Sequence, residues 1–66
     1  MISLTLNGEP HPTEADSVFA LVAELKLPPE TLLIEHNGFA LHRSQWTETR
    51  LLDGDQIEFL RVAAGG

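Results

Sequence analysis

Two Asn-Gly dipeptides, at 7–8 and 37–38, restrict the fold of this chain more than any other feature of its sequence. Asn-Gly favours the two-residue turn of a β-hairpin, because both positions of that turn need a positive φ. Before the first dipeptide, Ile2, Leu4 and Leu6 alternate with polar residues, which is the period of a strand with one buried face. The sequence therefore predicts two hairpins, one at the start of the chain and one in its middle.

The returning strand of the first hairpin, in "EPHPTEA", contains Pro10 and Pro12, which cannot donate a ladder hydrogen bond. We expect this strand to be short and to lie at a sheet edge. In the second hairpin, a turn at 37–38 sets three pairs opposite one another: Ile34 with Leu41, Leu32 with Arg43, and Glu35 with Ala40.

A helix is predicted between the two hairpins. Its apolar stripe has the spacing i, i+3, i+4, i+7 and consists of Val18, Leu21, Val22 and Leu25. Ser17, or alternatively Asp16, supplies the N-cap oxygen. We expect the stretch "LPPE" at 27–30 to end the helix, because proline cannot continue it and disfavours helical geometry in the preceding residue.

The last third of the chain predicts a turn and one more strand. "SQWTETRLL" is read as an irregular connection in which Trp46 closes one edge of the core, and "DGD" at 53–55 is a turn by composition. In the final strand, "QIEFLRV", burying Glu58 without a partner would be costly. We therefore expect Ile57 and Phe59 in the core, and Leu60 and Val62 on the open face.

This order of elements predicts an α+β roll in which one main helix covers one face of a mixed sheet of four to five strands. The helix crosses between the hairpins, which places the first and last strands side by side and parallel. That is the β-grasp arrangement of ubiquitin-like domains. We expect residues 1–62 to form this domain and residues 63–66 to be a flexible C-terminal tail.

Size, cysteine content and charge exclude several classes of function. The chain has 66 residues and no cysteine, so disulfides, thiolate zinc sites and thiol nucleophiles are excluded. A formal net charge of -6 disfavours nucleic acid and anionic membranes and favours a protein partner with a basic surface. No apolar run approaches the length of a membrane span. These features predict a cytoplasmic protein that binds no cofactor of its own.

The tail offers one chemical group. Two alanines and then Gly65 and Gly66 can enter a narrow channel, since glycine lets the backbone approach another molecule closely. The carboxylate of Gly66 is ionised at neutral pH and is a poor electrophile. It needs activation, most simply by adenylation, before a nucleophile can attack it.

The segments "EHNGFALHRSQW", "LLDGDQIEFLRV" and "AAGG" resemble the thiamine-biosynthesis sulfur-carrier proteins, the ThiS family. The resemblance implies that an E1-like adenylating enzyme of the ThiF type uses ATP to adenylate Gly66, and that sulfur from a persulfide donor replaces AMP. The resulting thiocarboxylate would donate sulfur to a thiazole synthase of the ThiG type. By the same resemblance, Gly65 gives access to the partner's site, and Leu60 and Val62 belong to the surface that contacts the partner. From the residues themselves we also expect Ala64, as a small tail residue, to give access, and Glu58 to contact a basic partner surface. The chain would then be a protein co-substrate and not an enzyme.

Several alternatives stay open. The chain could be a sulfur carrier for another pathway, of the molybdopterin small-subunit type, a ubiquitin-like protein modifier, or a β-grasp binding module without tail chemistry. The spacings of His11, His36 and His42 match no metal-site signature. The acidic residues Asp53, Asp55 and Glu58 could either contact a basic partner surface or be turn and surface residues. Arg43, Ser44 and Trp46 could form a site, or they could have a structural role in packing.

Overall fold

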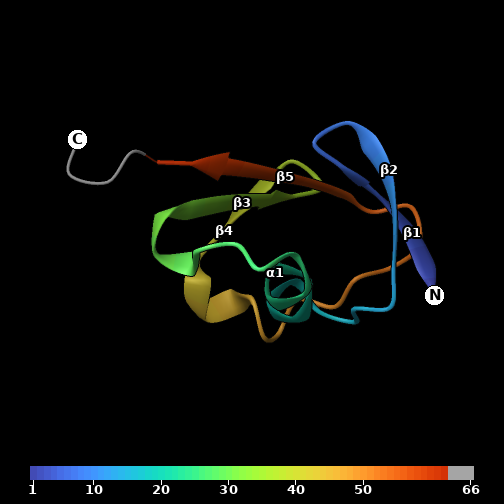
Figure 1. The fold of residues 1–66 in the computed structure, drawn as a ribbon, viewed down its shortest axis with the longest axis horizontal. Coiled ribbons are helices and arrows are strands. Elements are labelled where there is room, and N and C mark those ends of the chain that lie inside the picture. The colour runs from blue at the N-terminus through green and yellow to red at the C-terminus, as the bar shows by residue number, and fades with distance from the viewer. Residues whose placement is uncertain (63–66) are drawn as a thin grey trace.

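The computed structural model describes residues 1–62 (Figure 1). The elements follow one another as β1 (Ile2–Leu6), β2 (Glu9–Thr13), α1 (Val18–Leu25), the 3-10 turn η1 (Pro29–Thr31), β3 (Leu32–His36), β4 (Phe39–Leu41), the 3-10 turn η2 (Arg43–Gln45) and β5 (Gln56–Arg61). The predicted helix and both predicted hairpins are thus confirmed.

The five strands form one mixed sheet in the order β2-β1-β5-β3-β4. β1 and β5 are parallel, whereas β1 with β2, β3 with β4 and β3 with β5 are antiparallel. Figure 1 shows α1 against one side of this sheet only. The predicted α+β roll of β-grasp type, with its parallel first and last strands, is confirmed.

The strand registers confirm most of the predicted hairpin pairs. β2 lies at a sheet edge, and Ile34 stands opposite Leu41 as Glu35 does opposite Ala40. The prediction that Leu32 pairs with Arg43 is wrong, because β4 ends at Leu41 and Arg43 begins η2. Leu32 pairs with Arg61 of β5 on its other side.

The helix begins as predicted, and its last residue is the last residue of the predicted apolar stripe. The side chain of Ser17 accepts a hydrogen bond from the Ala20 N–H at 3.1 Å, which makes Ser17 the N-cap. The last helical residue is Leu25, before the prolines. Lys26 takes the left-handed conformation with φ 57°, and its N–H donates to the Ala23 carbonyl at 3.2 Å. This left-handed residue closes the helix two positions before Pro28.

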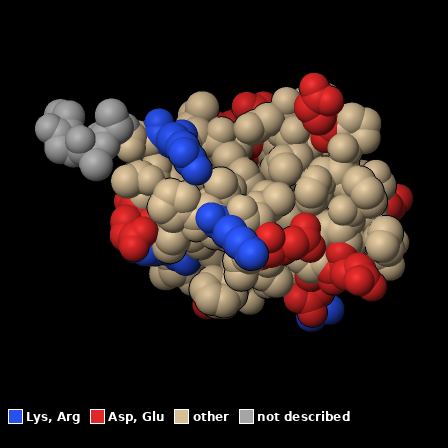
Figure 2. Space-filling model, in the orientation of Figure 1, with Lys and Arg blue, Asp and Glu red and all other residues tan. Residues whose placement is uncertain are grey.

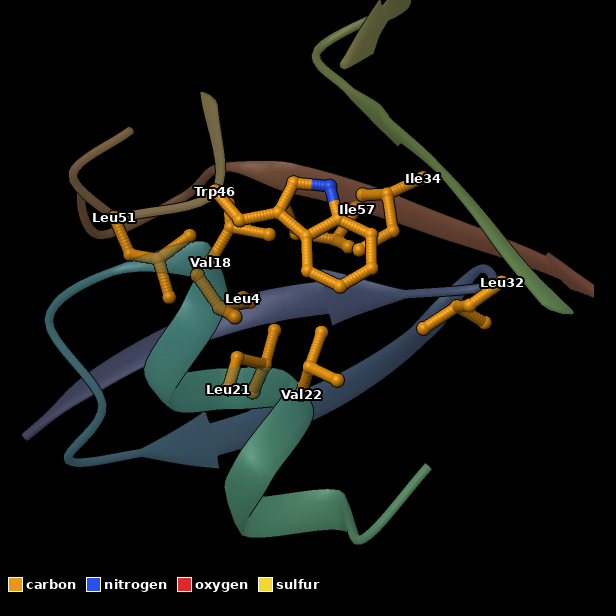
Figure 3. Packing of buried hydrophobic residues seen from close by; sticks show 9 residues of the cluster. All are labelled: Leu4, Val18, Leu21, Val22, Leu32, Ile34, Trp46, Leu51 and Ile57. Carbon is orange, nitrogen blue, oxygen red and sulfur yellow. The ribbon is translucent and has the colours of Figure 1, made fainter. Parts of the chain in front are cut away.

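The core lies between α1 and the sheet and includes the connection before β5. Its nine buried apolar residues are Leu4, Val18, Leu21, Val22, Leu32, Ile34, Trp46, Leu51 and Ile57 (Figure 3). Trp46 is only 3% exposed, as expected for a residue that closes the edge of the core. Figure 3 shows its indole between β5 and the side chains of α1.

Candidate functional site

β5 is the strand that connects the core to the C-terminal residues. It is the central strand of the sheet, with β1 on one side and β3 on the other. Ile57 is completely buried and Phe59 packs against the core, whereas Leu60 and Val62 are 55% and 49% exposed. The predicted orientation of this strand is therefore confirmed, and its outward apolar residues directly precede residues 63–66.

Leu33 on β3 adds a third residue to this apolar surface. It stands directly opposite Leu60 in the antiparallel register and is 55% exposed. The Val62 N–H donates to the Thr31 carbonyl at 2.8 Å, which holds the end of the strand beside β3. We call Leu33, Leu60 and Val62 the apolar patch. Sequence reasoning missed Leu33, although its phase in "LLIEH" is opposite to that of the buried Leu32 and Ile34.

Glu58 lies on the same face of β5 as Leu60, and it is exposed. The register sets Glu35 of β3 directly opposite it. Two carboxylates thus share the open face with the apolar patch. The sheet brings the predicted partner residues Glu58, Leu60 and Val62 to one surface, and their role in partner binding stays a prediction.

The two Asn-Gly turns hold β5 from opposite sides. The Asn7 N–H donates to the Ile57 carbonyl at 2.9 Å, and its Oδ1 accepts from the Phe59 N–H at 2.7 Å. Across the strand, the Asn37 N–H donates to the Gln56 carbonyl and its Oδ1 accepts from the Gln56 N–H, both at 2.8 Å. Each asparagine therefore serves both its own turn and the central strand.

Asp55 is a structural residue of the turn before β5 and not an exposed partner contact. It is 8% exposed, and its carboxylate accepts from Leu52 N–H at 3.0 Å and from Asn37 Nδ2 at 3.2 Å. His36 Nε2 lies 2.8 Å from Asp55 Oδ2. Burial pushes the pKa of Asp55 upward, but the hydrogen bonds from His36, Leu52 and Asn37 outweigh it, so the pKa lies below its ordinary value.

Asp53 also has a structural contact, since its Oδ1 accepts from the Ser3 N–H at 2.8 Å. This bond joins the turn to β1, next to the bond from the Gly54 N–H to the Ser3 carbonyl at 2.9 Å. Of the three acidic residues predicted as partner contacts or turn residues, only Glu58 is free of such a bond within residues 1–62. The turn interpretation accounts for Asp53 and Asp55.

The three histidines take part in local polar contacts. His11 Nε2 lies 3.2 Å from Glu24 Oε2, and Thr13 Oγ1 donates to Glu24 Oε1 at 2.7 Å. The Thr13 bond and then the His11 bond lower the pKa of Glu24. The His42 N–H donates to Gln45 Oε1 at 2.8 Å in η2. Within residues 1–62, no group of three His, Asp or Glu side chains is arranged to hold a metal ion.

Arg43, Ser44 and Trp46 do not form a site. Arg43 and Ser44 are exposed in η2, while Trp46 is buried in the core. The indole Nε1 of Trp46 is buried without a hydrogen-bond partner in the described part of the chain. The structural interpretation of this segment is therefore favoured. In the same part of the chain, no helix has the length and apolar character needed to cross a membrane.

The residues predicted to carry the chemistry, Ala64, Gly65 and Gly66, lie outside the described residues. The predicted domain boundary after residue 62 and the tail at 63–66 therefore stay predictions. What the described residues establish is the base of the tail: a central strand held at its start by two turns, with the apolar patch at its end.

Comparison with known proteins finds relatives that match this chain over nearly its whole length. The family profile described as the ThiS family matches residues 4–66. The crystal structure of the thiamine biosynthesis protein ThiS from Geobacter metallireducens is similar with a TM-score of 0.85 and 36% identity, covering 98% of this chain and 100% of that one. The solution structure of a thiamine biosynthesis protein from the same organism gives a TM-score of 0.80 at 35% identity, covering 98% and 88%. No curated protein matches the sequence significantly.

Proposed function

The chain belongs to the ThiS family, and from this we propose that it is a sulfur carrier of thiamine biosynthesis whose carrier group is the carboxylate of Gly66. The match to the family extends through Gly65 and Gly66. In this role the chain is a co-substrate that other proteins activate and consume. It provides the folded domain they recognise and the carboxylate they modify.

The proposed chemistry has two stages. A ThiF-type enzyme catalyses attack of the Gly66 carboxylate on the α-phosphate of ATP, which releases pyrophosphate and leaves an acyl adenylate. Sulfur from a persulfide donor then displaces AMP, and reduction of the remaining sulfur–sulfur bond by a thiol leaves the thiocarboxylate. Adenylation is needed because a carboxylate is a poor electrophile, and AMP is a far better leaving group than an oxide ion. A ThiG-type thiazole synthase would take the sulfur.

The observation that carries this proposal is the position of the apolar patch at the end of β5 and on the neighbouring β3. Leu60 and Val62 are exposed immediately before residue 63, and Leu33 enlarges the surface from the neighbouring strand. A partner that covers Leu33, Leu60 and Val62 is thereby placed next to the start of the tail. Exposed apolar groups that gather in one place are typical of a protein-docking surface.

Intact-mass analysis tests the proposal. The chain is incubated with ATP, its cognate adenylating enzyme, a cysteine desulfurase, cysteine and a reductant. We expect a mass increase that corresponds to one sulfur in place of one oxygen, and fragmentation should assign it to Gly66. A chain that lacks Gly66 should fold normally and gain no sulfur. The cognate enzyme is first shown to be active on a second carrier protein. If the intact chain then forms neither adenylate nor thiocarboxylate with this enzyme, the proposal is wrong.

The same experiment distinguishes the alternatives. Conjugates joined to lysines of other proteins would favour a ubiquitin-like modifier. A thiocarboxylate that supports thiazole formation with a ThiG-type synthase would favour thiamine, whereas transfer only to a molybdopterin synthase subunit would favour the other carrier role. The resemblance to thiamine biosynthesis proteins over 98% of this chain favours thiamine.

A further inference from the structure

The charges on the open face of the sheet are of one sign. The outward residues of the five strands are Ser3, Thr5, Pro10, Pro12, Leu33, Glu35, Ala40, Gln56, Glu58 and Leu60. Glu35 and Glu58 are the charged members of this set, and they stand directly opposite each other on adjacent strands. The centre of the open face is therefore acidic.

The basic side chains of the chain lie elsewhere. Lys26 follows α1, and Arg43 begins η2. The backbone of Arg50 pairs with that of Ser17 at the start of the helix, and Arg61 has the phase of the inward residues of β5. These four are all the Lys and Arg residues in the sequence. On the face seen in Figure 2, acidic side chains are widely spread and basic ones lie mainly in the left half. No residue of the described chain supplies a cation between Glu35 and Glu58.

Like charges directly opposite each other in a sheet are unfavourable in the free protein. Glu58 is exposed and Glu35 is half-buried, and neither side chain has a hydrogen bond or ion pair within residues 1–62. A guanidinium or ammonium group placed between the two carboxylates would remove this repulsion and form charge-assisted bonds with both. The pair thus favours a bound state in which another molecule brings the cation.

The apolar patch identifies that molecule as a protein. Glu35 is two residues from Leu33 along β3, and Glu58 is two residues from Leu60 along β5, so the acidic pair and the apolar pair are adjacent on one face. Side chains two apart on a strand point to the same side. A small cation would match the carboxylates alone, whereas a protein surface can match both halves.

We propose that the partner which docks on this face carries an arginine or lysine that binds between Glu35 and Glu58, beside an apolar surface that covers Leu33 and Leu60. This inference rests on the proposed function, since the partner is taken to be the adenylating enzyme that acts on Gly66. The inference adds Glu35 and Leu33 to the predicted partner contacts. It also means that the carboxylates of Glu35 and Glu58 bind the same cationic side chain of the partner.

The test compares a Glu35→Gln, Glu58→Gln double variant with a control, Glu14→Gln, Glu48→Gln. The control removes the same charge from exposed positions outside the open face, where neither side chain has a hydrogen bond within residues 1–62. Binding of each protein to the purified cognate adenylating enzyme is measured by calorimetry at low and high salt. We expect the open-face variant to bind at least about tenfold more weakly at low salt, with less dependence on salt, and the control to bind within about twofold of wild type.

Thermal unfolding of the free proteins separates recognition from structure. Since the repulsion is removed, the open-face variant should unfold at the same temperature as wild type or higher. A lower unfolding temperature would make the pair a structural element and overturn the inference. Equal loss of affinity in both double variants would do the same, because only net charge would then matter.

The outcome is distinct from failure of the proposed function. If wild type acquires sulfur at Gly66 and the open-face variant binds the enzyme as tightly as wild type, the carrier role stands and the paired-carboxylate contact is wrong. If wild type acquires no sulfur with an enzyme of demonstrated activity, the proposed function fails first.

Discussion

The two Asn-Gly turns have the same sequence and nearly the same backbone, yet they are embedded differently. Asn7 and Asn37 have φ of 50° and 52°, and Gly8 and Gly38 have φ of 83° and 87°. Both asparagines accept a hydrogen bond from β5 through Oδ1. Within residues 1–62, only Asn37 also uses its Nδ2, which donates to the buried Asp55. Identical local sequence thus provides a surface turn in one place and part of a polar cluster in the other.

The largest difference should appear when each asparagine is changed to aspartate. Asn37→Asp replaces the donor to Asp55 with a second carboxylate, and we expect it to lower the free energy of unfolding by about 2–3 kcal/mol at pH 7. Urea unfolding measures this loss. The loss should shrink below about pH 4, where one of the two carboxyls binds a proton. An unchanged urea midpoint at pH 7 would mean that the contact between Asn37 and Asp55 does not contribute to the stability of the protein.

The Asp55 cluster should also give the domain an acid-sensitive contribution to stability. The pKa of Asp55 is lower in the folded protein than its ordinary value, so its contribution is complete above the unfolded pKa of about 3.9 and is lost as pH falls through the lower folded value. We expect Asp55→Asn to lower stability by about 1–2 kcal/mol at pH 7 and to flatten the decline below pH 4. Urea unfolding from pH 2 to pH 7 measures both effects. A variant with the wild-type acid slope would show that other carboxylates dominate.

The glycines should behave alike in the two turns. A Cβ at Gly8 or Gly38 would meet no atom within 4 Å, so the cost of alanine is only that of the positive φ. We expect Gly8→Ala and Gly38→Ala each to reduce stability by about 1 kcal/mol, and the two losses to agree within about 0.5 kcal/mol. Thermal unfolding of the two variants in parallel measures the difference. A clearly larger loss of stability at one glycine would show that the two turns differ in their backbones, and not only in the contacts of their asparagine side chains.

The smallest effect should come from Asn7→Asp. The carboxylate keeps the oxygen that accepts from the Phe59 N–H, and no carboxylate of the Asp55 cluster contacts this turn in the described structure. We expect the free energy of unfolding to stay within about 0.5 kcal/mol of wild type at pH 7, with the Phe59 amide still protected from hydrogen exchange. Loss of that protection would show that the Nδ2 group of Asn7 has a role of its own.

These two turns also show how far the sequence predicts the structure. The dipeptides, the alternation in β1 and the helical stripe are local signals, and they are sufficient for the β-grasp arrangement and for the outward orientation of Leu60. The contact of Asn37 with Asp55 joins residues 18 apart and depends on the register of β3 with β5. The register of β3 with β5 cannot be predicted from any local sequence pattern.

The same limit applies to the candidate site. The strand phase places Glu58, Leu60 and Val62 on one face, but their neighbours Leu33 and Glu35 become visible only when β3 is aligned with β5. The end of the helix shows a different limit. The prolines at 28 and 29 are strong signals, yet Lys26 has already left helical geometry, with Leu27 donating to the Val22 carbonyl at 3.3 Å. A left-handed lysine has no clear sequence signature, since glycine is the usual residue there.

The strand order has a consequence for synthesis of the chain. The hairpin β1–β2 and the pair β3–β4 belong to one sheet only through β5, which is the last strand to be made. A chain that stops before residue 56 has two hairpins, β1–β2 and β3–β4, that are not joined in one sheet. An isolated hairpin is at best marginally stable. The domain can therefore close only after its last strand has been translated. A formed sheet therefore shows that the chain has been made at least through β5, and a partner that requires this sheet would not bind a chain that stops before it.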